Sequence, residues 1–439
     1  MVALGFTLQP DEEFLGLCDE IIASRIDYVE IVPETSWQVD ESGRLYENDF
    51  HAHFAALMKR AGLFAVAHGV GLSLGTAHDE GPRRARWIER MRADQRVFDY
   101  RWYTEHLGAS SLAGQFMVLP VPTPMTALTA ALIGQRLDEM RAVVGDVGVE
   151  NSAFYMTWGP PSDEPQFLNR LLAEPGRHLL LDLHNLYTAA VNFGVDARAY
   201  LDALELERVI EIHLSGGSAS APTWLPGGDV MRLDSHDSAI PEPVWALLTA
   251  TLPRCPNLRG VTIERMEGTV EAADVAVIAS EVERARALIE QFAGAEARPG
   301  PTPARTSPVS PASPASPTST DNIDGYVRFE HGVAEALRGP DPAAAIRALA
   351  SDESIPAQLR RAAAAVEARG VQITALLIAQ LRFNRLLQGS PAAALWFERE
   401  PAEFARAFRA YHAEVVPSAY FPAEEGQRFL DWQLASELS

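Results

Sequence analysis

Short apolar runs alternate with longer amphipathic segments throughout residues 1–294, and this alternation restricts the possible folds more than any other feature of the sequence. The runs lie at residues 2–8, 27–34, 63–75, 101–108, 147–152, 178–187, 209–216 and 260–266. Strands that are apolar on both faces and are each followed by a helical pattern, such as 126–144 or 196–207, indicate a parallel sheet covered by helices. Eight such units fit a closed (β/α)₈ barrel of the TIM type, with an open doubly wound sheet as the alternative.

Residues 295–322 form a tract of Pro, Ser, Thr and Ala with almost no large apolar side chains. Such a composition cannot bury enough apolar surface to offset the entropy lost on ordering, so it is typical of a disordered linker. The tract therefore divides the chain into a barrel domain over residues 1–294 and a second domain over residues 323–439.

The second domain carries helical patterns and no catalytic signature. Apolar residues recur at helical spacing over residues 342–350, 355–370 and 401–416. In the last of these segments Phe404, Phe408 and Tyr411 fall on one face, which is more often a core face than a cofactor site. We expect a small all-α accessory domain that is tethered behind the barrel.

Charge and cysteine content exclude several classes of function. The chain has a formal net charge of −22, whereas binding to nucleic acid or to anionic lipid depends on clustered Lys and Arg. Cys18 and Cys255 are too distant for a disulfide framework or a zinc ribbon and indicate two buried thiols. The N-terminus lacks a signal-peptide pattern, and no apolar stretch reaches the ~18 residues that span a bilayer. We expect a cytoplasmic protein with no nucleic-acid or membrane partner.

Histidines and carboxylates gather where the predicted strands end, which is where this fold carries its chemistry. The candidate residues at these ends and in the following loops are Glu34, His68, Glu105, His106, Glu150, Asn151, Asp182, His184, Asn185, His213, Asp234, His236 and Glu264. So much negative charge cannot be buried on one rim without cations, and metal ions supply them. The sequence predicts a metal centre. It shows no dinucleotide fingerprint, P-loop or nucleophile elbow that would indicate a separate catalytic or cofactor site.

Each of these residues also has a purely structural explanation. A histidine on an apolar strand is usually a hydrogen-bonded core residue, and this applies to His68 and His213 taken singly. Glu30 and Glu211 lie inside the predicted strands, so they can equally well form ion pairs within the barrel. The metal hypothesis rests on the convergence of the set rather than on any one member.

The ligand types restrict the metal. No cysteine is among the candidates, so iron–sulfur clusters and structural zinc are disfavoured, and mixed nitrogen and oxygen donors suit non-haem iron, manganese or zinc. Eight or more ligands exceed the coordination of one ion, which predicts two or three ions bridged by a carboxylate such as Glu150. Glu105, Asn151 and Asn185 are placed to accept hydrogen bonds from the second nitrogen of the ligand histidines.

Six motifs carry a family resemblance: HGVGLSLG (68–75), VENS (149–152), LLLDLHNLY (179–187), EIHLSG (211–216), LDSHDSAIPEPVW (233–245) and IER (263–265). Over about residues 3–290 the sequence resembles the multinuclear non-haem iron-dependent oxidative enzymes, formerly domain of unknown function 692, which include the iron enzyme of methanobactin biosynthesis. The resemblance implies a (β/α)₈ barrel with two or three iron ions of mixed Fe(II)/Fe(III) valence, which uses dioxygen to modify peptides made on the ribosome, often at cysteine. The iron ligands that it implies are His68, His106, Glu150, Asp182, His213, Asp234, His236 and Glu264.

The chain departs from the family pattern at two places. Relatives often carry an asparagine pair where this chain has His184-Asn185, and a Gly-His pair where it has Gly216-Gly217. His184 is therefore a candidate ligand beyond the implied set, and the second change alters the surroundings of the third metal position or of the substrate pocket.

The C-terminal helices resemble the small partner proteins that bring precursor peptides to these enzymes. The resemblance rests on RFNRLLQG (382–389) and FARAFRAYHAEVVPSAYFP (404–422), and it implies that the fused domain replaces a separate partner protein. The leading hypothesis is thus an iron-dependent oxidase or oxygenase that acts on a precursor peptide recognised by this domain. Two alternatives are a divalent-metal sugar isomerase, epimerase or phosphodiesterase on a similar barrel, and a metal-loaded peptide-binding scaffold without turnover.

Overall fold

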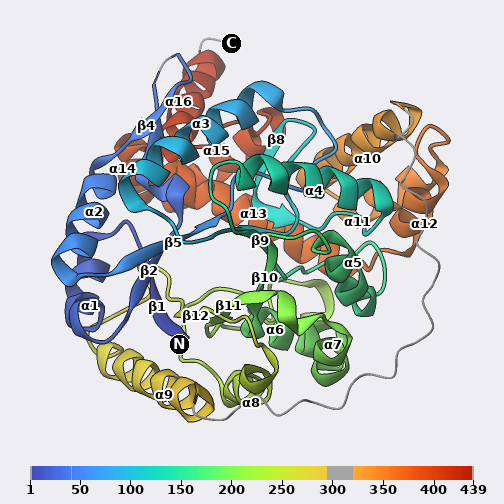
Figure 1. Cartoon of the computed structure of the whole chain (residues 1–439). Coiled ribbons are helices and arrows are strands. Elements are labelled where there is room, and N and C mark those ends of the chain that lie inside the picture. The colour runs from blue at the N-terminus through green and yellow to red at the C-terminus, as the bar shows by residue number, and fades with distance from the viewer. Residues whose placement is uncertain (1, 41, 294–319, 438–439) are drawn as a thin grey trace, which may run out of the picture.

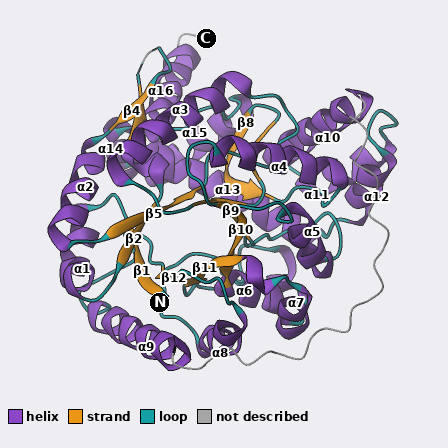
Figure 2. Ribbon diagram, in the orientation of Figure 1, coloured by secondary structure: helices purple, strands orange, loops and turns teal. Residues whose placement is uncertain are grey.

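Eight parallel strands form a closed barrel in the computed structural model, which describes residues 2–40, 42–293 and 320–437. In order around the barrel they are β1 (Ala3–Leu8), β2 (Tyr28–Ile31), β5 (Phe64–Gly69), β6 (Tyr103–His106), β9 (Val147–Glu150), β10 (Arg177–Asp182), β11 (Val209–Leu214) and β12 (Gly260–Ile263). β12 pairs with β1 and closes the ring (Figure 2). Each strand coincides with one of the predicted runs, with β10 beginning one residue earlier, so the (β/α)₈ barrel is confirmed and the open sheet is excluded.

Helices cover the outside of the barrel (Figure 1). They are α1 (Glu12–Ser24), α2 (Asp49–Ala61), α3 (Gly81–Phe98), α4 (Ala127–Arg141), α5 (Glu164–Leu171), α6 (Leu183–Phe193), α7 (Ala197–Ala203), α8 (Glu242–Thr251) and α9 (Val275–Ala293). Side chains fix several of the helix starts: Thr126 accepts from the backbone N–H of Thr129 at α4, and Asp182 accepts from that of Asn185 at α6. Since Asp182 ends β10 and also caps α6, its position at the rim is set by both elements.

Two short antiparallel hairpins interrupt the barrel pattern. One is β3 (Trp37–Val39) with β4 (Leu45–Glu47), and the other is β7 (Ala109–Leu112) with β8 (Gln115–Val121), which directly follows β6. The apolar pattern of the sequence does not predict either hairpin. The second becomes important because it carries the contact with the C-terminal helices.

The barrel interior holds two buried glutamates, Glu30 and Glu211, whose hydrogen-bond partners are side chains on or next to the barrel strands. Glu211 accepts from Tyr28 Oη, Trp102 Nε1 and Thr262 Oγ1 at 2.9, 2.6 and 2.6 Å. Glu30 accepts from Thr7 Oγ1 at 2.9 Å and lies 2.8 Å from His213 Nε2. These bonds agree with the structural explanation offered for the two glutamates, and Glu30, Glu211 and His213 also form a group whose potential ligand atoms lie within 4.8 Å of one another. Cys18 and Cys255 are free and buried, as expected.

The C-terminal region is entirely helical in its described residues. It consists of α10 (Thr320–Arg338), α11 (Pro342–Ala348), α12 (Ala357–Ala365), α13 (Ala368–Gly389), α14 (Pro391–Arg399), α15 (Pro401–Glu414) and α16 (Pro422–Glu437). Phe404, Phe408 and Tyr411 are buried in one apolar cluster, as predicted. The predicted linker lies outside the described residues except for 320–322, which the structure places in α10.

The single helix predicted over residues 355–370 is wrong. Val366 is extended, at φ −62° and ψ 135°, and the axes of α12 and α13 differ by 91°. Just after the break, α13 packs so closely on the barrel loop at Tyr155 that a Cβ atom on Gly370 would be 2.1 Å from the Tyr155 carbonyl oxygen. No single helix in the described ranges is long and apolar enough to cross a membrane, although α12 and α13 pass that test together as a bent pair.

The helical region packs directly against the barrel, which corrects the expectation of a domain tethered behind it. Tyr326, Phe329 and Val333 of α10 share one apolar cluster with side chains of the β7–β8 hairpin, including Leu112 and Met117. Further along the chain, the ring of Tyr420 lies 4.4 Å from that of Phe116 and packs over the guanidinium of Arg83. The two regions therefore share a core, so their stability is coupled.

Glu330 of α10 anchors the loop that follows β5. Its buried carboxylate accepts from Thr76 Oγ1 and from the backbone N–H groups of Ala77 and His78. Replacing Glu330 with alanine leaves these donors without an acceptor, and we expect the free energy of unfolding to fall by about 1–3 kcal/mol. Urea denaturation measures the loss. Arg328→Ala, at an exposed position of the same helix, is the control, and equal losses in both variants would contradict the anchoring role.

Candidate metal centre

The carboxyl ends of the barrel strands bring the predicted ligands together. β5 supplies His68, β6 supplies His106, β9 supplies Glu150, β10 supplies Asp182 and β11 supplies His213, while Glu264 directly follows β12 and Asp234 and His236 lie in the loop between β11 and α8. Short contacts connect all eight residues into one continuous group. The inner members are fully buried, whereas the side chains of His106, Asp234 and His236 are 22%, 18% and 15% exposed. A substrate can therefore approach from the side of these three.

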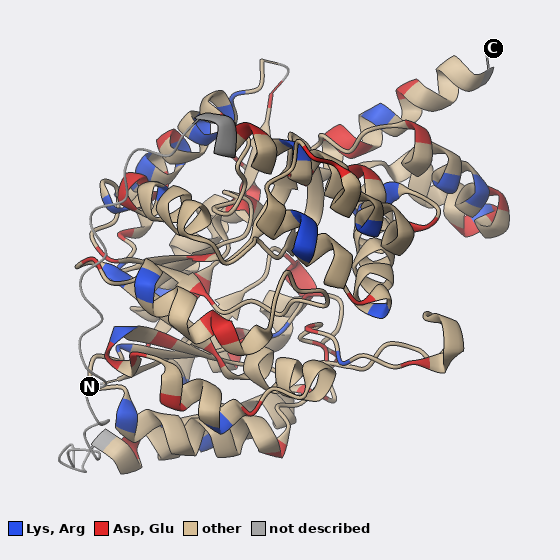
Figure 3. Cartoon of the chain, turned by 90° about the vertical axis from the view of Figure 1, so that its right-hand side faces the viewer, with Lys and Arg blue, Asp and Glu red and all other residues tan. Residues whose placement is uncertain are grey.

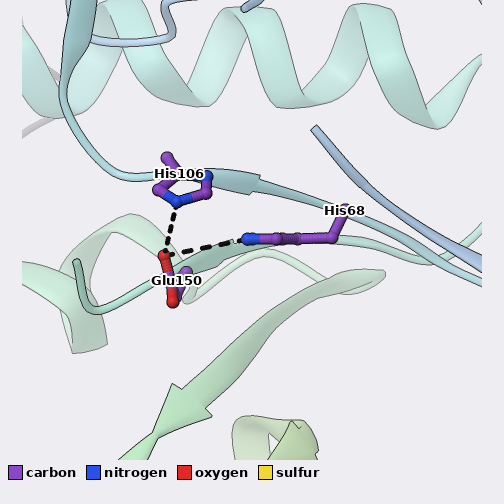
Figure 4. A group of neighbouring side chains, drawn as sticks. All are labelled: His68, His106 and Glu150. Atoms are coloured by element: carbon purple, nitrogen blue, oxygen red, sulfur yellow. Dashed lines mark ion pairs between the residues drawn. The ribbon is translucent and has the colours of Figure 1, made fainter. Parts of the chain in front are cut away.

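His68 and His106 both direct Nε2 toward one oxygen of Glu150 (Figure 4). The distances to Glu150 Oε2 are 3.8 Å from His68 and 3.4 Å from His106. The opposite nitrogen of each ring is already bonded: His106 Nδ1 donates to the Gly69 carbonyl at 3.0 Å, and His68 Nδ1 lies 2.9 Å from Thr104 Oγ1. Because the Thr104 hydroxyl is directed to the Ala67 carbonyl, it accepts from His68. Both rings thus carry the proton on Nδ1 and present a free lone pair on Nε2.

Glu150 also belongs to a second group, with Asp182 and His213. One ligand atom from each of the three lies within 4.8 Å of the others. His213 donates from Nε2 to Glu30, so its Nδ1 is left facing Glu264 Oε2 at 3.0 Å. Since Glu150 is shared between the two groups, it is the residue best placed to bridge two ions.

Asn151 and Asn185 form hydrogen bonds with the carboxylate ligands and not, as predicted, with the ligand histidines. Asn185 Nδ2 donates to Glu150 Oε1 at 3.0 Å, and Asn151 exchanges two hydrogen bonds with the backbone of Asp182. The acceptors of the histidine N–H groups are instead Thr104, the Gly69 carbonyl and Glu30. Thr104 could have been found from the sequence, because it lies two residues before His106 on one strand and so on the same face.

Glu34 and Glu105 lie outside the group of eight. Glu34 accepts from the backbone N–H groups of Val70 and Gly71 and from Trp87, so it supports the glycine loop after His68. Glu105 is buried on the opposite face of β6 from His106, and burial together with the nearby charge of Glu34 raises its pKa well above the usual value. These two candidates therefore support the strand ends without facing the centre.

His184 is engaged at both ring nitrogens. The guanidinium of Arg232 can only donate, so His184 Nε2 accepts from it at 3.2 Å. His184 Nδ1 must then carry the proton, and it donates to Asp234 at 3.1 Å. His184 also fills the space next to Gly217, where a Cβ atom would lie 2.9 Å from its Cε1. In this arrangement His184 positions Asp234 and is not itself available as a ligand.

Among the described residues, buried Asp182 Oδ2 has no hydrogen-bond partner, and His213 Nδ1 and Glu264 Oε2 meet only each other, at 3.0 Å. Burying a polar atom without a partner costs about 1–3 kcal/mol. Carboxylate oxygens and imidazole nitrogens are ligand atoms of mixed N/O metal sites, and Asp182 and His213 belong to a candidate ligand group of the described residues that contains no sulfur. The residues present therefore fit a non-haem metal centre.

The protonation of two buried ligands, Glu150 and His68, also favours metal binding. Burial raises the pKa of Glu150 well above its usual value, and the charge of Asp182 adds to the shift. Burial lowers the pKa of His68 well below its usual value, with His106 and His213 adding to the effect. His68 is thus a neutral donor, and Glu150 has a high affinity for any cation that replaces its proton.

Asp234 and His236 are expected to act as a pair. Asp234 Oδ1 lies 2.8 Å from His236 Nε2, and its backbone N–H donates to Tyr155 Oη. Asp234→Ala and His236→Ala should each remove about one metal ion and abolish turnover. Far-UV circular dichroism should be nearly unchanged, because both residues lie in a loop. The control is Ser235→Ala between them, and a variant that simply unfolds would identify the pair as structural.

Residues 5–290 match the family described as RiPP precursor modification enzyme MbnB/TglH/ChrH. A UPF0276 protein of Bordetella bronchiseptica is 36% identical over 244 residues, which cover 54% of this chain and 79% of the relative. One of Shewanella amazonensis is 28% identical over 275 residues, covering 62% and 90%. Among solved structures, a xylose isomerase domain protein of Planctomyces limnophilus aligns with a TM-score of 0.43 at 15% identity, covering 67% of this chain and 99% of the other. From the family match over most of the barrel, we conclude that this chain belongs to the MbnB/TglH/ChrH family of RiPP precursor modification enzymes.

Proposed function

We propose that this protein is an iron-dependent oxidase or oxygenase that uses dioxygen to modify a ribosomally made precursor peptide, at a cysteine. The family match supports peptide modification. The redox part of the proposal is supported by the buried set of imidazole and carboxylate donors, in which Asp182 Oδ2 has no hydrogen-bond partner among the described residues and His213 Nδ1 faces Glu264 Oε2 at 3.0 Å. Nitrogen and oxygen donors without sulfur suit non-haem iron.

The eight residues of the centre would hold two or three iron ions, with Glu150 shared between two of them. Bound iron would supply the one-electron redox chemistry that reaction with dioxygen requires. The protein's own residues provide order and charge balance: Thr104, the Gly69 carbonyl and Glu30 each bond the second ring nitrogen of a ligand histidine, and His184 holds Asp234. The partly exposed side of His106 and His236 admits the peptide.

The C-terminal helices would act as a fused recognition domain for the precursor peptide, in place of a separate partner protein. This proposal is supported by their position. α10 binds the loop after β5 through Glu330, and Tyr420 packs on Arg83 of α3, so the helices lie against loops of the same rim that carries the ligands. A peptide held by these helices would lie near the centre.

Anaerobic reconstitution with Fe(II), followed by oxygen uptake and mass spectrometry in the presence of candidate peptides, tests the proposal. We expect His106→Ala to lose iron and oxygen uptake. The matched control is His178→Ala. His178 lies at the N-terminal end of β10, away from the metal centre, and bonds Asp146. Activity with zinc or manganese in the absence of oxygen would favour an isomerase or hydrolase instead. Iron loading and peptide binding without any turnover would indicate a scaffold.

A further inference from the structure

A cleft of about 610 Å³ separates α12 from the barrel. Gln358, Leu359 and Arg361 line it from α12, and residues of the loops before α4 and α5, together with Arg170 of α5, line it from the barrel. Its volume lies in the range of ligand-binding clefts. The cleft exists only because the helical region is docked, so neither region forms it alone.

A narrower cavity shares a wall with this cleft and reaches residues that adjoin the metal centre. Met125, Trp158 and Phe167 line both spaces, and the cavity extends from them to Leu107 and Ser152. Leu107 directly follows His106, and Ser152 Oγ lies 3.3 Å from Glu150 Oε2. A ligand in the cleft can therefore extend along a mainly apolar wall toward the centre.

The shape of the two spaces selects an elongated ligand. The cavity measures about 50 Å³, so it admits an extended chain or a small side chain but no compact large group. Trp158 forms a fixed part of the wall, because its ring packs edge-on against Phe329 of α10 at 5.0 Å and its Nε1 donates to the Pro122 carbonyl. A peptide segment in the cleft with one small residue in the cavity has this shape.

The charge of the cleft favours acidic ligands. Arg170 and Arg361 line it from opposite walls, and neither forms an ion pair in the described part of the chain, while Asp163 is the acidic residue of the lining. Elsewhere basic residues are interspersed with acidic ones (Figure 3), and the chain carries a net charge of −22. Two unpaired guanidinium groups on facing walls are therefore positioned to bind carboxylates.

The geometry points to the α12 cleft as the binding site for an acidic segment of the substrate peptide, with the cavity beside Trp158 leading from it toward Glu150. The assignment rests on the proposed function only in identifying the ligand as a substrate. Binding of an acidic peptide in the cleft depends on Arg170 and Arg361 whatever chemistry follows.

Fluorescence anisotropy with the full-length protein tests this assignment. The probes are a Gly/Ser peptide that contains several glutamates and carries a neutral dye, and the same peptide with lysine for each glutamate. We expect the glutamate peptide alone to bind. Arg361→Glu and Arg170→Glu should each weaken that binding by about fivefold, the size of one exposed ion pair. Arg406→Glu, an exposed position of α15, is the control and should leave binding unchanged.

Two results would overturn the assignment. One is equal binding of the two peptides to the wild-type protein, and the other is an equal loss in Arg406→Glu and the cleft variants, which would mean only general electrostatic attraction. The proposed function fails separately. If no iron binds or no oxygen is consumed while Arg361→Glu still weakens peptide binding, the cleft stands and the iron chemistry falls. If oxygen uptake is normal but peptide binding is unchanged in Arg361→Glu, the iron chemistry stands and the cleft assignment fails.

Discussion

Replacing Glu150 with alanine is expected to remove more than one metal ion from each chain. One oxygen of Glu150 faces His68 and His106, and the residue also forms a group with Asp182 and His213. A carboxylate shared in this way serves two ions, so about two ions should be lost rather than one. Elemental analysis of the reconstituted protein, set against protein concentration from amino-acid analysis, measures the change.

The metal-free Glu150→Ala protein should be no less stable than the metal-free wild type. Burial raises the pKa of Glu150, which means that the empty centre already penalises its charge. Glu164→Gln is the matched control, because it changes another glutamate whose pKa is raised by burial, to about 7, but whose carboxylate bonds Tyr200 outside the centre. Full metal occupancy in Glu150→Ala, or the loss of a single ion, would refute the bridging role.

Truncation after residue 293 is expected to destabilise the barrel strongly. It exposes the face of the β7–β8 hairpin that packs on α10, including Leu112, Met117 and Val121, and it removes Glu330 and Tyr420. At about 1.5–3 kcal/mol for each large apolar side chain returned to water, the loss exceeds about 5 kcal/mol and should lower Tm by about 10 °C or more. Differential scanning calorimetry measures this shift.

Metal content should fall together with stability in the truncated barrel. The loop braced by Glu330 begins directly after His68, so loosening it disturbs the first ligand strand. Co-expression of residues 320–437 as a separate chain is the control, and it should restore both Tm and metal content if docking rather than chain continuity matters. An isolated barrel with unchanged Tm and full metal content would show that the two regions are independent, as a tethered arrangement requires.

The barrel and its rim could be predicted from the sequence because both follow from local patterns. Apolar runs of strand length mark the strands, and the position of a residue such as His68 or Asp182 at the end of its run is sufficient to place it on the catalytic rim. All eight predicted ligands lie in one connected group of the structure. The break between α12 and α13 was missed for the opposite reason, since local pattern favoured one helix and the chain breaks just before Gly370 packs on the distant Tyr155.

Local pattern gives no information on which distant residues meet. His213 is bonded to Glu30 across the barrel, 183 residues away in sequence, and this contact decides which of its nitrogens faces the centre. Arg232, 48 residues from His184, lies 3.2 Å from the Nε2 atom of that histidine and so occupies one of its two nitrogens. The sequence by itself thus determined the barrel and the ligand types on its rim. Only the tertiary structure decided the protonation of each imidazole and the docking of the C-terminal helices, because hydrogen bonds and shared cores depend on neighbours in space rather than on spacing along the chain.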